Sequence, residues 1–167
     1  AKKGNLDGLR RLREDMCPWS PDAYKAAARG GHLHVIQWLL KEGCPTNMDI
    51  HIAAAKGGHL HILQWLRAED LFYLHCPGDR ESQISHVAAQ EGHLHILKWL
   101  QKEGLSLGEM NHIFAARAGQ LFVLHWMWTM NLLSRTRIRH VGLHAEEKGH
   151  LSILSWLEVL DRRSLSP

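Results

Sequence analysis

The chain has 167 residues, of which 45% are hydrophobic and 22% charged, and its formal net charge is +3; these ordinary globular values exclude long disorder. The longest mostly apolar stretch, residues 121–133, is interrupted by polar residues and is shorter than the ~20 residues that span a bilayer, so we expect no membrane insertion. Three cysteines are too few for a disulfide framework, which favours an intracellular, reducing compartment, with the cytoplasm preferred over an organelle.

One short motif recurs along the whole chain. Gly-His-Leu-His occurs three times, and three looser copies complete a set whose glycines lie 27, 27, 34, 27 and 30 residues apart. Self-similarity at such a period is typical of stacked repeats. We therefore predict a single repeat array over residues 1–167, with about six copies anchored at Gly4, Gly31, Gly58, Gly92, Gly119 and Gly149.

The first copy is incomplete, because only Ala1 to Lys3 precede Gly4 and the chain does not begin with Met. A half-repeat is a poor cap for an array. We expect the chain to be a fragment, a processed product, or the ordered part of a longer protein.

After each glycine the spacing predicts an amphipathic helix. Leu stands two residues after every anchor glycine, Leu or Ile five after it, and Trp seven after it in five of the six copies. Apolar residues three and four apart form one face of a helix. Twelve residues after the glycine, five of the six copies have a residue that tolerates the left-handed conformation, so we expect the helix to end there, at Met16 (the exception), Gly43, Asp70, Gly104, Asn131 and Asp161.

Before each glycine a shorter, Ala-rich helix is predicted, with small residues that let two helices approach closely. Ser20-Pro21-Asp22 predicts its start in one copy, with Ser20 as the cap and Pro21 at the first helical position, and Ser82 and Ser134 or Thr136 are the corresponding caps later. The seven extra residues between the third and fourth glycines fall in 68–80, where Phe72 and Tyr73 either tuck onto the stack or meet a partner.

Residues 31–40, Gly-His-Leu-His-Val-Ile-Gln-Trp-Leu-Leu, preceded by Ala27 and Ala28, resemble the second half of an ankyrin repeat, and residues 85–94 resemble its helix-turn-helix junction. Two departures stand out: the period is 27 and not 33, with the missing residues at the projecting fingers, and the opening Thr-Pro is absent. The resemblance implies an all-α, ankyrin-like helix-turn-helix solenoid of about six repeats. It also implies that the His after the glycine is structural, with its ring bonded to backbone in the turn.

We expect no metal, no cofactor and no small-molecule substrate. Each cysteine precedes a proline, and Cys17 and Cys44 recur at one repeat position, which favours a structural role in the seam between copies. Equivalent atoms of stacked repeats lie roughly 10 Å apart, so neither the cysteines nor the repeated histidines converge on one ion. His140 and His144, four apart on a predicted helix, are the one pair that could share an ion, but no third ligand is visible.

The chain is interpreted as a non-catalytic protein-binding scaffold, since no catalytic constellation stands apart from the repeats. The repeated tryptophans favour a packing ladder over a stacking surface, whereas Trp19 and Trp128 lie off the ladder and are better placed for outside contacts. An alternative is a structural subunit that docks on RNA through basic runs, against the simpler interpretation that these runs are solvated.

The family resemblance places the binding residues on the concave face, in the two positions before each glycine, where they would attract an acidic segment: Arg29, Lys56, Gln90, Arg117 and Lys148. Loop candidates for partner or RNA contact are Trp19, Phe72, Tyr73, Arg135, Arg137 and Arg139.

Overall fold

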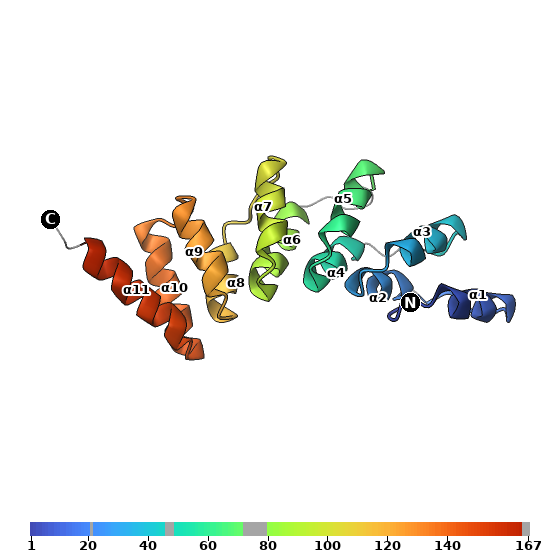
Figure 1. The fold of residues 1–167 in the computed structure, drawn as a ribbon, viewed down its shortest axis with the longest axis horizontal. Helices are drawn as coiled ribbons and strands as arrows, with labels where there is room; N and C mark the ends of the chain where they lie inside the picture. Colours follow the sequence, from blue (N-terminus) through green and yellow to red (C-terminus); the bar gives the residue numbers. More distant parts are fainter. Residues whose placement is uncertain (21, 46–48, 72–79, 165–167) are drawn as a thin grey trace. The chain divides into compact units, whose positions relative to one another are not determined.

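A computed structural model describes residues 1–20, 22–45, 49–71 and 80–164. Within these residues the chain forms eleven helices and no strand (Figure 1). The helices are α1 (Leu6–Glu14), α2 (Ala23–Arg29), α3 (Leu33–Lys41), α4 (Ile50–Gly57), α5 (Leu60–Ala68), α6 (Arg80–Glu91), α7 (Leu94–Lys102), α8 (Asn111–Arg117), α9 (Leu121–Thr129), α10 (Arg135–Lys148) and α11 (Leu151–Ser164).

The chain divides into two compact units, residues 1–80 and 81–167. In the first unit α2 pairs with α3, and α4 pairs with α5. The first helices of these two pairs, α2 and α4, also pack on each other. In the second unit α8 packs on α9, α10 packs on α11, and α8 packs on α10. Each pair is the helix-turn-helix predicted from the repeat, and the predicted all-helical fold is confirmed.

The anchor glycine makes the turn inside each pair. Gly31 has a φ of 79°, which a residue with a Cβ rarely adopts. The Gly31 N–H donates to Ala28 O (3.2 Å) and the His32 N–H donates to Ala27 O (2.9 Å), a Schellman ending that satisfies the last carbonyls of α2. The remaining anchor glycines all have φ between 67° and 78°.

The second helix of each pair, which follows the anchor glycine, ends where the sequence predicts, with one exception. Gly43 and Gly104 adopt positive φ, and so do the non-glycine residues Met16 (58°), Asp70 (54°) and Asn131 (56°). The prediction is wrong for Asp161, which lies inside α11. There the helix continues past the expected end, with Arg162 and Glu158 paired at 3.9 Å across one turn.

The predicted helix starts are only partly correct. Ser134 is the N-cap of α10, where its Oγ accepts the Arg137 N–H at 3.3 Å. Ser82 does not cap, because α6 begins at Arg80 and places Ser82 in its buried first turn. Helix α2 begins at Ala23, later than predicted, although Ser20 Oγ still accepts the Asp22 N–H at 3.3 Å; Pro21 lies outside the described residues.

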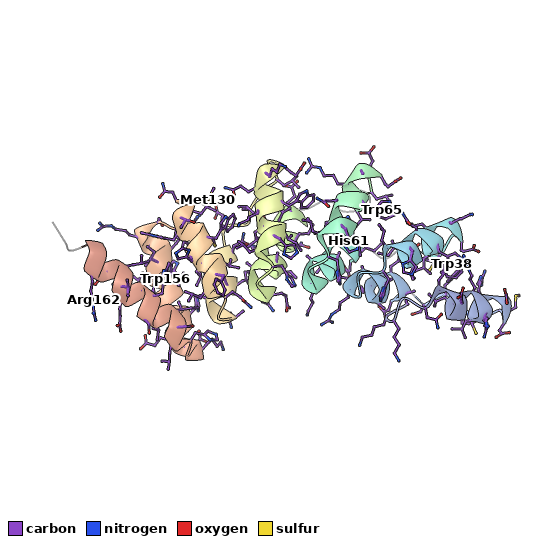
Figure 2. The ribbon with its side chains drawn as sticks, in the orientation of Figure 1. Trp38, His61, Trp65, Met130, Trp156 and Arg162 are labelled. Carbon is purple, nitrogen blue, oxygen red and sulfur yellow. The ribbon has the colours of Figure 1, made fainter. Side chains whose placement is uncertain are left out.

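Small residues and tryptophans build the core. Ala27 and Ala28 on α2, and Ala54 and Ala55 on α4, are fully buried where the two helices meet. The tryptophans that recur seven residues after the anchor glycine lie on the second helices, as Figure 2 shows for Trp38 and Trp65 in the first unit. In the second unit, Trp99 and Trp126 are buried and Trp156 is half-buried, as expected for packing residues. No described helix is long and apolar enough to cross a membrane.

Candidate functional site

Imidazole rings join each copy to the one before it. His32 Nε2 donates to Lys2 O at 3.0 Å, His59 Nε2 donates to Arg29 O at 3.0 Å, and His150 Nε2 donates to Arg117 O at 2.9 Å. The expected structural role of these histidines is therefore confirmed, and the backbone they bond is the turn of the preceding copy. The acceptor is in each case the residue two positions before that copy's anchor glycine.

In the fifth copy Gln120 takes the place of the histidine that follows the anchor glycine. Its Nε2 donates to Gln90 O at 3.1 Å, so the amide reproduces the bond that the imidazole makes elsewhere. A second row of rings reinforces the first unit, where His34 Nε2 donates to Gly4 O (3.1 Å) and His61 Nε2 donates to Gly31 O (3.2 Å). We call these side chain–carbonyl bonds the inter-repeat ladder.

The ladder packs closely against the glycine pairs that precede His32 and His59. A Cβ on Gly57 would lie 2.5 Å from Arg29 O and 2.6 Å from the His59 ring, and a Cβ on Gly30 would lie 2.8 Å from the His32 ring. Real Cβ atoms do not approach that closely, so a side chain here would push the ring and the preceding turn apart. Gly30 and Gly57 thus leave room for the ring and the preceding turn, whereas Gly31 and Gly58 supply the positive φ of the turn.

The residues whose carbonyls the ladder holds also line two grooves. In the first unit an open groove of about 830 Å³ is lined by Lys2, Arg29 and Lys56, over a floor that includes Ala26 and Ile52. In the second unit a groove of about 430 Å³ is lined by Gln90, Phe114, Arg117, Ala118 and Lys148. All five residues predicted for the concave face thus lie in one of these two grooves.

Carboxylates neutralise part of the first groove. Lys25 Nζ lies 2.7 Å from Asp49 Oδ2 and 3.9 Å from Asp22 Oδ1. The hydrogen bond that Lys25 donates to the Asp49 carboxylate raises the pKa of Lys25. Sequence reasoning missed this pair, because Lys25 occupies a position where the later copies have Ile52, His86, Ile113 and Leu143.

The second groove has a different chemistry. Its Phe114 ring packs against His86, with ring centroids 4.8 Å apart, which gives the groove an aromatic wall. Lys148 Nζ lies 3.4 Å from Glu147, and His144 Nδ1 donates to Glu147 at 3.3 Å. The His144 hydrogen bond, followed by the charge of Lys148, lowers the pKa of Glu147. Arg117 is exposed and contributes a further cation. Phe114 was not predicted, since it stands where other copies have Ala, Val or His.

The loop candidates have mixed placements. Trp19 packs edge-on against Trp38 (ring centroids 5.8 Å apart), and the Arg13 guanidinium lies 4.6 Å from the centre of the Trp19 ring. Arg137 Nη1 donates to Leu132 O at 2.9 Å, so this guanidinium stabilises the turn before α10, whereas Arg135 and Arg139 are exposed. Phe72 and Tyr73 lie outside the described residues. Contact of these loops with a partner or with RNA stays a prediction.

The remaining titratable groups fit structural roles. Cys44 is buried, and burial raises the pKa of its thiol, which disfavours a nucleophilic thiolate. His140 stacks on His112 with centroids 6.0 Å apart, and burial lowers the pKa of His112. Among the described residues no three His, Cys, Asp or Glu side chains gather as a metal site would require.

Comparison with known families identifies the class. The family model for ankyrin repeats matches residues 24–111, which is more than half of the chain, in three copies. The chain belongs to the ankyrin repeat family, whose members are in general non-catalytic protein–protein interaction modules. No curated protein matches the chain.

Proposed function

We propose that this chain is a protein-binding module that binds acidic segments of a partner protein, with one binding groove in each of its two units. The observation that carries the proposal is the repeated cation at the groove: Lys2, Arg29 and Lys56 line the first groove, and Arg117 and Lys148 line the second. Ladder bonds to Lys2 O, Arg29 O and Arg117 O fix the backbone from which three of these side chains project. A pre-organised row of cations speeds the encounter with an acidic partner.

The experiment compares two variants of equal charge change. Arg29→Glu with Lys56→Glu reverses the first groove, and the matched control, Arg10→Glu with Lys41→Glu, reverses two exposed cations elsewhere in the same unit. Arg117→Glu, alone, reports on the second groove. The partner is first captured with the unaltered chain and identified by mass spectrometry, and association rates with that purified partner are then measured at low and high salt.

We expect the groove variant to associate several-fold more slowly at low salt, with the difference shrinking as salt rises, because exposed charges are screened beyond about 10 Å at 0.1 M salt. The control should associate at the unaltered rate, and both variants should melt close to the parent because the charges are exposed. If the groove variant associates as fast as the control at low salt, the groove is not the binding surface.

A further inference from the structure

Helix α9 differs from the other second helices on its outward side. The exposed positions of α9 are Phe122, His125, Trp128 and Thr129, while Val123, Leu124, Trp126 and Met127 are buried. Phe122 is 84% exposed and Trp128 is 40% exposed. At the positions of Phe122, His125 and Thr129, α3 exposes His34, Gln37 and Lys41, and α7 exposes His95, Lys98 and Lys102; at the position of Trp128, α3 has the half-buried Leu40 and α7 the half-buried Gln101. The repeat fold therefore does not require apolar side chains there.

The neighbouring polar groups leave this stripe apolar. Thr129 Oγ1 donates to Trp126 O at 2.8 Å, which turns its hydroxyl back onto the helix. The His125 ring packs against Trp156 of α11, with centroids 6.4 Å apart. Met130, 46% exposed, extends the apolar surface at the C-terminal end of α9 (Figure 2). Exposed aromatic side chains that contribute nothing to the core are typical of interaction surfaces.

At the height of the stripe, the helices on either side of α9 expose side chains of opposite charge. On α7 the exposed residues Lys98 and Lys102 stand six and ten positions after the anchor glycine, and on α11 the exposed Glu158 stands nine positions after its own. Glu158 makes a 3.9 Å contact with the exposed Arg162. The acidic and basic groups thus lie at matching heights, on opposite sides of the apolar stripe.

We propose that the outer stripe of α9 is a self-association surface that binds the same stripe of a second copy. A two-fold axis running along α9 in the interface exchanges the two sides, so that α7 of each copy faces α11 of the other. Phe122 and Trp128, about 120° apart around the helix, then lie on either side of the axis and are both covered by the second copy, and Glu158 of each copy lies between Lys98 and Lys102 of the other. Because the axis places the basic residues of α7 opposite the acidic residue of α11, the charges of two copies are complementary, and this favours a second copy over an unrelated partner.

The exposed areas imply a weak, reversible dimer. An aromatic side chain buries roughly 150–250 Å² when fully covered, so the still-exposed parts of Phe122 and Trp128 in two copies supply on the order of 500 Å². With the flanking charges the interface stays below about 1,200 Å², the range of transient complexes.

The test is sedimentation of the full 167-residue chain over a concentration series from about 1 to about 300 μM, the range in which a transient interface is populated. We expect a monomer–dimer equilibrium that Phe122→Ala with Trp128→Ala weakens at least tenfold. The matched control, Met110→Ala with Leu143→Ala, removes two exposed apolar side chains that lie off the stripe and should leave the equilibrium unchanged. Circular dichroism checks that every variant keeps its helical content. A chain that remains monomeric throughout, or a control that weakens the dimer equally, overturns the proposal.

Charge exchange tests the pairing itself. Lys98→Glu with Lys102→Glu, and separately Glu158→Lys, should each weaken association at low salt, because both place like charges opposite one another. Mixing the two variants should restore association, since each copy then faces the charge it needs. Single variants that dimerise like the unaltered chain, or a mixture no better than its components, would show that α7 and α11 do not meet in this way.

Discussion

Substituting Gly57 by Ala tests the account of the inter-repeat ladder most directly. In an ordinary helix this change is favourable by up to about 1 kcal/mol, because Ala has the higher helix propensity. Here the new Cβ would lie 2.5 Å from Arg29 O, a backbone atom of the preceding copy, and 2.6 Å from the His59 ring. Neither atom is the tip of a flexible chain, so α2 and α4 must separate. Overpacking of this kind costs about 1–3 kcal/mol, and we expect a net loss of about 1–2 kcal/mol.

Gly142 provides the matched control. It lies inside α10, and a Cβ there would meet Leu157 Cδ1 at 3.5 Å, an ordinary contact. Gly142→Ala should therefore stabilise by up to about 1 kcal/mol. Thermal unfolding followed by circular dichroism separates the two, because about 1 kcal/mol corresponds to roughly 2–4 °C in Tm for a chain of this size. A rise in Tm for both variants would refute the close packing of the ladder against the glycine.

Three further predictions concern single residues. His59→Ala should cost about 1–3 kcal/mol because Arg29 O loses its donor, whereas His59→Gln should cost much less, since Gln120 makes the same bond naturally; denaturant unfolding measures both. Met16→Gly should raise stability by about 0.5–1 kcal/mol in the same assay, because it relieves a positive φ at an exposed side chain, and a loss would contradict the strain. Burial lowers the pKa of His112, so the unfolded chain takes up a proton at higher pH than the folded chain does, and the stability of the fold should fall as pH drops below about 6.5. His112→Gln should therefore flatten the dependence of Tm on pH. Parallel curves of Tm against pH for the two proteins would contradict this prediction.

The repeat period predicts much of the fold because it reports local geometry. The glycine spacing and the apolar positions locate the helix pairs, and the residue twelve positions after the glycine adopts positive φ in five of the six copies, even where it is Met16. Asp161 breaks the pattern because helix length also depends on the residues that follow. Ser82 fails as a cap because the copy with the insertion begins its helix earlier, at Arg80.

The candidate site is less readable from sequence, for a different reason. The repeat period determines where His59 lies within its own copy, but it does not determine to which carbonyl of the preceding copy its ring donates a hydrogen bond. The Lys25–Asp49 ion pair joins residues 24 apart and depends on how α2 and α4 pack, and the apolar stripe of α9 becomes visible only when burial separates Phe122 from Val123. Four of the five groove residues were predictable because they stand two positions before an anchor glycine; the fifth, Lys148, stands one position before Gly149.

The ladder has a consequence for how such a chain can change. Every described acceptor in the ladder is a main-chain carbonyl, so these bonds between copies do not depend on which side chain the acceptor residue carries. The four residues two positions before a glycine that are held in this way are Lys2, Arg29, Gln90 and Arg117, and they differ in charge and size although their carbonyls are bonded alike. A substitution at one of these positions therefore leaves the bond to its carbonyl in place, so the side chains that line the two grooves can change one residue per copy while these bonds between copies stay the same.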